Sequence, residues 1–116
     1  MQRLVKGDAM IKLRSVPTES AQLVLTDPPY GIGYQSTTGV KIKNDERPFI
    51  WWMHDAHRIC KPGGGILCFT RWDIQDSFKL AIEAAGFKIR SQVVWDKGGN
   101  GMGDCKTQFS PRHELI

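Results

Sequence analysis

The chain has no long apolar run and few cysteines, and these absences exclude several classes of protein. Its 116 residues contain no apolar stretch of the roughly 20 residues that a membrane-spanning helix needs. Residues 1–6 also lack the continuous apolar segment of a secretory signal peptide. Three cysteines without a Cys-x-x-Cys spacing indicate neither a disulfide framework nor a zinc site. We therefore expect a cytoplasmic protein with free thiols, no membrane association and no bound metal.

Two further patterns are weak or missing. His54 and His57 are three residues apart in a predicted helix, a spacing that metal ligands can use, but the sequence offers no third ligand nearby. We interpret both as part of a solvated helix face. No helix-turn-helix or zinc-finger pattern is present. The net charge of +4 fits a polyanionic partner without identifying one.

The chain is long enough for one domain of modest size, with 41% hydrophobic residues to build a core. Strand and helix patterns alternate along it, which favours a mostly parallel sheet covered by helices on both faces. The predicted elements are a strand at residues 3–5, a short helix at 9–13, a buried strand at 22–26, a helix from Pro48 to Cys60 ended by residues 61–64, a buried strand at 66–69, a helix capped by Asp73 and ended before Gly86, a strand at 87–95 and a last element from Gln108.

Three polar residues are predicted at the carboxyl ends of strands, where ligands of parallel sheets bind. They are Asp8, Asp27 and Thr70, and we expect them to share one cleft. Two loops should border that cleft. One is the polar segment 31–44, which contains three glycines, and the other is the glycine-rich segment 97–106.

The most informative motif is Asp27-Pro28-Pro29-Tyr30, at the end of the apolar run 23–26. The two prolines fix φ and hold the residue before each of them extended. A carboxylate, a rigid carbonyl and an aromatic ring are therefore set side by side. Those groups suit the binding of a flat heterocycle that carries an exocyclic amine.

The tetrapeptide and its flanks resemble the amino-group DNA methyltransferases that use S-adenosyl-L-methionine (AdoMet). That family has Asp, Asn or Ser, then Pro-Pro, then an aromatic residue after a strand. Similar segments follow here at residues 61–67, 93–97 and 109–114, and Gly7-Asp8 precedes them. The order is similar to the permuted class, in which the catalytic segment comes before the AdoMet-binding glycine motif. The resemblance implies a partial Rossmann-like, doubly wound, mostly parallel sheet with helices on both faces.

The resemblance also implies an activity, adenine-N6 methylation of double-stranded DNA, with AdoMet as methyl donor and the target base flipped out of the duplex. The amine of adenine is a poor nucleophile because its lone pair is delocalised into the ring. Asp27 and the Pro28 carbonyl would each accept one amine hydrogen, which localises that lone pair on nitrogen. Pro29 completes the rigid segment, and Tyr30 would stack on the flipped base. No metal is implied.

By resemblance, Asp8 and Ala9 would bind AdoMet together with Asp27. Asp8 is equally suited to capping a helix N-terminus. Phe109 would stack on the flipped base opposite Tyr30, although a core aromatic is the stronger interpretation.

Three lysines are candidates for contacts with DNA phosphates. Lys41 and Lys43 lie in the first predicted loop, and Lys97 begins the second. Taken singly, each is explained as well by a solvated loop charge.

In the permuted family a Phe-x-Gly-x-Gly-like segment follows these motifs, and residues 1–116 contain none. Gly31-Ile32-Gly33 does not replace it, because it follows the catalytic strand. We therefore expect residues 1–116 to form the catalytic half of one methyltransferase domain. Such a half would bind AdoMet weakly by itself and would need a dimer partner or a complementing segment.

Four alternatives stay open. Cytosine-N4 methylation is a close variant, although that branch more often has Ser at the Asp27 position. Protein-glutamine methyltransferases share the chemistry and favour Asn there. A truncated, inactive remnant that binds nucleic acid weakly is a third interpretation. An unrelated small α/β domain is the fourth, and it requires the motif to be a coincidence.

Overall fold

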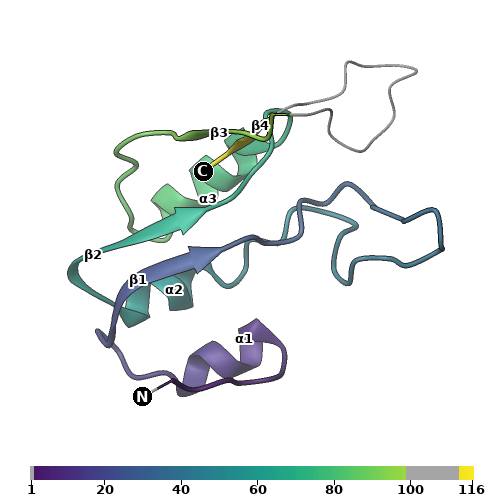
Figure 1. The fold of residues 1–116 in the computed structure, drawn as a ribbon. Helices are drawn as coiled ribbons and strands as arrows, with labels where there is room; N and C mark the ends of the chain where they lie inside the picture. Colours follow the sequence, from purple (N-terminus) through teal and green to yellow (C-terminus); the bar gives the residue numbers. More distant parts are fainter. Residues whose placement is uncertain (1, 99–112) are drawn as a thin grey trace.

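The centre of the fold is a pair of parallel strands, β1 (Ala21–Thr26) and β2 (Cys60–Cys68), which lie side by side in Figure 1. The structure, a computed structural model, describes residues 2–98 and 113–116. Because the two strands are parallel and Thr26 pairs with Cys68, both end at the same edge. That edge is where a ligand is expected in such a sheet.

Helices flank this pair. They are α1 (Ala9–Lys12), which continues into the 3₁₀ turn η1 (Leu13–Ser15), α2 (Met53–Ile59) and α3 (Gln75–Ala84). The buried cluster draws on α2, α3 and the end of β2: Trp52, Met53, Ala56, Cys68, Phe78 and Ala85. Trp52, Met53 and Ala56 are spaced as on one helix face, and all three are buried. No helix in the described residues is both long and apolar enough to cross a bilayer.

A second, smaller pairing joins β3 (Val94–Asp96) to β4 (His113–Leu115) in antiparallel fashion. Leu115 also exchanges backbone hydrogen bonds with Thr70, just beyond β2, at 2.8 and 3.3 Å. The chain end therefore lies between the continuation of β2 and β3. This arrangement of strands and helices confirms the α/β class.

The two faces of the β1–β2 pair differ sharply. Val24 and Ile66 point toward the helices and pack against the core cluster. The opposite face carries Leu23, Leu25 and Leu67, whose exposed fractions are 52%, 63% and 43%. Within the described residues the helices thus cover one face of the pair. The prediction that the strand at residues 22–26 is buried is therefore wrong. An apolar run predicts burial on both faces, but only packing partners can provide it.

The start of β2 also differs from the prediction. The run Lys61-Pro62-Gly63-Gly64 predicts a helix end, followed by a strand from residue 66, yet the strand begins at Cys60. A Cβ atom at Gly64 would lie 2.9 Å from the Gln22 carbonyl oxygen. Glycine therefore allows a close approach to β1 at this position, where it was expected to break the chain.

Two other strand predictions need correction. Residues 3–5 form no strand, and within the described part of the chain no backbone hydrogen bond joins residues 2–7 to another segment. A strand needs such a ladder, and Leu4 is fully exposed. The predicted strand 87–95 is reduced to β3, because residues 88–92 form no backbone hydrogen bond with another described segment.

The helix ends follow the predictions in part. Asp8 caps α1 by accepting a hydrogen bond from the Met10 amide at 2.9 Å. Gly86 follows α3 with φ +111°, as expected of a terminating glycine. Asp73 does not cap that helix, because both its carboxylate oxygens bind Arg71. The helix predicted from Pro48 begins at Met53.

Candidate active site

The tetrapeptide leaves β1 at its carboxyl end and forms one connected unit. The Tyr30 hydroxyl donates to Asp27 Oδ1 at 2.7 Å. The half-buried Tyr30 ring meets Phe78 edge-on, with ring centroids 6.4 Å apart. Asp27 itself is exposed, and Oδ1 is the oxygen that Tyr30 occupies. Its Oδ2 accepts no hydrogen bond from the described residues and is available to a ligand.

Burial and the Asp27 charge shape the titration of two neighbouring groups. Burial of the ring, then the hydrogen bond to Asp27 and the charge of that carboxylate, raise the pKa of Tyr30 far above its ordinary value. Burial, followed by the Asp27 charge, raises the pKa of the Cys68 thiol to about 12. At neutral pH both groups are therefore protonated, and Asp27 faces a phenol that can donate to it.

The two prolines differ in their backbone contacts. Pro28 is buried, and its carbonyl receives no hydrogen bond from the described residues. The Pro29 carbonyl accepts from the Phe49 amide at 3.2 Å. Carbonyls in buried segments are nearly always paired in folded proteins. Among the described residues the Pro28 carbonyl is thus left without a donor, next to Asp27 in the sequence.

The segment after the tetrapeptide is a loop, as the sequence predicts, and internal hydrogen bonds hold it. The buried Asp45 carboxylate accepts hydrogen bonds from three backbone amides, those of Gly31, Ile32 and Tyr34. Sequence reasoning missed Asp45, because nothing in a polar stretch distinguishes it from Glu46 next to it. We call residues 31–47 the 31–47 loop.

The loop lies beside the predicted cofactor residues. A cavity of about 430 Å³ is lined by Asp8 and Ala9 from one side and by Lys43, Asn44 and Phe49 from the other. Asp8 uses Oδ1 to cap α1, and its Oδ2 accepts no hydrogen bond from the described residues. The structure therefore places Asp8 and Ala9 at a cavity, and the Phe49–Pro29 hydrogen bond connects that cavity to the tetrapeptide.

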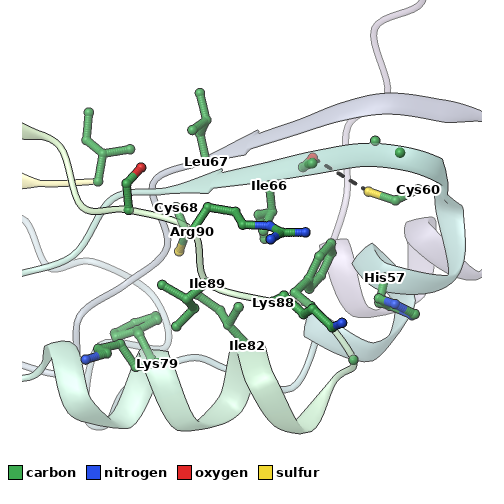
Figure 2. Close-up of a pocket in the computed structure, with 18 of the residues that line it drawn as sticks. His57, Cys60, Ile66, Leu67, Cys68, Lys79, Ile82, Lys88, Ile89 and Arg90 are labelled. Atoms are coloured by element: carbon green, nitrogen blue, oxygen red, sulfur yellow. Dashed lines mark hydrogen bonds between the residues drawn. The ribbon is translucent and has the colours of Figure 1, made fainter.

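A larger cavity, of about 980 Å³, lies elsewhere and includes no residue of the tetrapeptide. Figure 2 shows it between β2 and α3, with Lys88, Ile89 and Arg90 crossing it. Its walls include Ile66 and Ile82. His57 also borders it and packs edge-on against Phe87. Within residues 2–98 and 113–116, no three potential metal-binding side chains gather, there or elsewhere.

The DNA candidates are placed differently from one another. Lys41 and Lys43 are exposed, and neither forms a salt bridge with another described residue. Lys97 forms a salt bridge with Glu114 and lies 5.7 Å from the centre of the Trp95 ring. Phe109 and most of the segment 97–106 lie outside the described residues.

Comparison with known proteins places this geometry in context. Residues 21–116 match a protein family described as DNA methylase. Type II methyltransferase M.BglII from Bacillus subtilis is 31% identical over an alignment that covers all of this chain and 34% of that protein. DNA adenine methyltransferase YhdJ from Escherichia coli (strain K12) is 28% identical, with 97% of this chain and 39% of that protein covered.

A solved structure has the same fold. It is a candidate DNA modification methylase from Thermus thermophilus, crystallised with S-adenosyl-L-methionine. It superposes with a TM-score of 0.67 at 21% identity, covering 95% of this chain and 51% of the other. The Rossmann-like α/β prediction is thereby confirmed. The chain spans between a third and two fifths of the curated relatives described above, 34% and 39% of their lengths.

Proposed function

Since this chain belongs to the DNA methylase family, we propose that it is the catalytic half of a DNA adenine-N6 methyltransferase. In this proposal it transfers a methyl group from AdoMet to the exocyclic amine of a base flipped out of duplex DNA. The observation that carries the proposal is the fixed pair of acceptors at the end of β1. Asp27 is held by Tyr30 at 2.7 Å, and the adjacent Pro28 carbonyl has no donor among the described residues.

The acceptor pair explains how the amine would be activated. Asp27 Oδ2 accepts one amine hydrogen and the Pro28 carbonyl accepts the other, so the nitrogen lone pair is drawn out of the ring and becomes nucleophilic. Pro28 and Pro29 fix both acceptors before the base arrives, which removes reorganisation from the reaction. Tyr30 keeps its proton because its pKa is raised, so it holds Asp27 in place without competing for protons.

The residues at the smaller cavity fit the cofactor. Asp8 provides a carboxylate that can accept from an adenine amine, and Phe49 provides an aromatic ring beside it. Ala9 leaves room because its side chain is one methyl group. When bound, AdoMet supplies an electrophilic methyl group carried on a sulfonium sulfur.

DNA is the proposed substrate, and Lys41 and Lys43 are the proposed phosphate contacts. Both are exposed without a salt bridge to a described residue, so no internal contact has to be broken when DNA binds. Lys97 is a weaker candidate because Glu114 already neutralises it. We also propose Phe109 as the second stacking residue. Full activity is proposed to require a dimer partner or a complementing segment.

Adenine is favoured over cytosine by two observations. Asp27 occupies the position at which the cytosine-N4 branch more often has Ser. In addition, one relative of 28% identity is named as a DNA adenine methyltransferase. Digestion of methylated DNA followed by mass spectrometry separates the products. N6-methyladenine is expected, and N4-methylcytosine would contradict the choice of base.

The test is transfer of a tritiated methyl group from AdoMet to duplex DNA by the chain and two variants. Asp27→Ala should lower incorporation by about a hundredfold or more, because it removes an acceptor from the reacting centre. Asp73→Ala is the matched control, since this exposed carboxylate binds Arg71 and not the tetrapeptide. Circular dichroism should show all three folded. An inactive parent chain would support the requirement for a complementing segment, whereas undiminished transfer by Asp27→Ala would exclude the acceptor pair.

A further inference from the structure

Asp45 is the most deeply buried charged side chain in the described residues, with 2% of its surface exposed. Its Oδ1 accepts from the amides of Gly31 at 2.8 Å and Ile32 at 3.4 Å, and its Oδ2 accepts from the amide of Tyr34 at 2.7 Å. Its backbone carbonyl also accepts from the Gly33 amide at 2.7 Å. One residue thus binds four successive amides across a sequence distance of more than ten residues. Burying a carboxylate is costly unless it is hydrogen-bonded in this way.

The backbone at both ends of the 31–47 loop is shaped for this contact. Gly31 has φ +78°, and Asn44, just before Asp45, has φ +64°. A Cβ atom at Gly31 would overlap the backbone of Arg47 and Pro48. The two ends of the loop therefore touch, and the left-handed residues turn the chain so that the Asp45 carboxylate points at the amides.

The contact also reaches the tetrapeptide. The amide of Gly31, which Asp45 Oδ1 binds, belongs to the peptide group that follows Tyr30. Fixing that peptide group fixes the backbone from which the Tyr30 ring projects. The Tyr30 hydroxyl in turn donates a hydrogen bond to Asp27 Oδ1 at 2.7 Å. A continuous series of hydrogen bonds and one peptide bond thus joins Asp45 to Asp27.

We propose that Asp45 is a positioning residue for the base-binding site, holding Tyr30 at the place where its hydroxyl reaches Asp27. The inference rests on the proposed function for its meaning, since Asp27 and Tyr30 are the proposed amine acceptor and stacking residue. The geometric part stands by itself, and so it can be tested without methyl transfer.

The first test is amide hydrogen exchange on Asp45→Asn. Asparagine keeps the shape and one oxygen but replaces the other oxygen with an NH2 group, which cannot accept from a backbone amide. Exchange at Gly31, Ile32 or Tyr34 should accelerate roughly tenfold, the effect of losing one such hydrogen bond. Asp73→Asn removes the same charge from an exposed site and should leave these amides unchanged. Equal exchange in both variants would overturn the proposal.

The second test reads Tyr30 directly. The chain has two tyrosines, so in a Tyr34→Phe background the absorbance of phenolate at 295 nm reports Tyr30 alone. The Tyr34 amide that Asp45 binds is unaffected by this change. If Asp45 holds the ring against Asp27, adding Asp45→Asn should lower the titration midpoint of Tyr30 toward about 10, the value of a free phenol.

A purely structural role for Asp45 predicts a different result. In that case Tyr30 would ionise only when the whole chain unfolds, so circular dichroism is recorded during the same titration. Ionisation of Tyr30 before the loss of helical signal supports positioning. A midpoint equal to that of the Asp73→Asn control, or ionisation coincident with unfolding, overturns it. Because neither readout uses AdoMet or DNA, a failure of the proposed function would be seen separately, in the methyl-transfer assay.

Discussion

The hydroxyl of Tyr30 donates to the carboxylate of Asp27 over 2.7 Å, so the first and last residues of the tetrapeptide are held together. The prolines between them have little freedom, and the Tyr30 ring rests against Phe78. The Asp27 carboxylate is therefore held in place by the chain itself. Several measurable consequences depend on this contact and on the packing beneath it.

Removing the Tyr30 hydroxyl should change stability at alkaline pH. Burial first, and the hydrogen bond to Asp27 second, raise the pKa of Tyr30 above its ordinary value of about 10. The folded chain keeps a proton that the unfolded chain releases. This stabilisation is therefore complete below about pH 10 and is lost as the pH rises further. Urea titrations at pH 8 and pH 11 should show a smaller alkaline loss for Tyr30→Phe than for the parent. An equal loss in both would contradict the contact.

Cys68 should resist alkylation in the folded chain. Its pKa is raised from 9.0 to about 12, first by burial and then by the charge of Asp27. At pH 8 this lowers the reactive thiolate fraction about a thousandfold. Mass spectrometry after iodoacetamide treatment should show slow labelling of Cys68 in buffer and fast labelling in urea. Asp27→Asn should accelerate the folded reaction. Labelling at the urea rate in buffer would show that the thiol is not buried.

Gly31 and Gly33 form a matched pair for the closure of the 31–47 loop. Both have positive φ, +78° and +61°, so alanine is strained at either site by about 1–2 kcal/mol. Only at Gly31 would the added methyl group also overlap the backbone of Arg47 and Pro48. Gly31→Ala should therefore lower the free energy of unfolding by at least about 1 kcal/mol more than Gly33→Ala, as measured by urea denaturation. Equal effects would mean that the loop ends do not touch.

Phe78 and Leu80 test the packing beneath the tetrapeptide. Both lie on α3, but Phe78 is 1% exposed and touches Tyr30, whereas Leu80 is 69% exposed. Phe78→Ala should lower the free energy of unfolding by about 3–5 kcal/mol, and Leu80→Ala should change it by less than about 0.5 kcal/mol. Urea denaturation measures both. Similar losses of unfolding free energy in the two variants would contradict the burial of Phe78 in the core.

The lysines should differ in their contribution to DNA binding. Lys41→Gln and Lys43→Gln should each weaken binding and reduce the slope of log K against log salt by about 0.9. Lys97→Gln should have a smaller effect, because Glu114 already pairs with this lysine. Fluorescence anisotropy with a labelled duplex between low and moderate salt measures these slopes. A larger effect at Lys97 would reverse the proposed placement of DNA.

The features that could be predicted from the sequence are those that depend on neighbouring residues, such as the rigid backbone of the tetrapeptide. The double proline stiffens the chain after an apolar run, and this effect does not depend on distant residues. The capping role of Asp8 and the terminating role of Gly86 are also local. Helical spacing places Trp52 on the same face as Met53 and Ala56, and it is buried while Trp51 is exposed.

Several features that the sequence could not reveal depend on partners far away in sequence. Gly64 resembles a chain breaker until β1 is known to pass within contact distance of it. Leu25 resembles a buried residue until it is known that no described segment covers it. Asp45 is indistinguishable from Glu46 until the loop closes and four amides converge on one of them. Spacing along the chain carries no information about such contacts.

The leucine face of the β1–β2 pair has a practical consequence at the bench. Among the described residues, Leu23, Leu25 and Leu67 present adjoining exposed hydrocarbon on the two paired strands. A purified sample should stick to phenyl resin, bind apolar dyes while still native and precipitate as it is concentrated. Mild detergent or storage at low concentration should keep the protein in solution, because either reduces contact between these apolar faces.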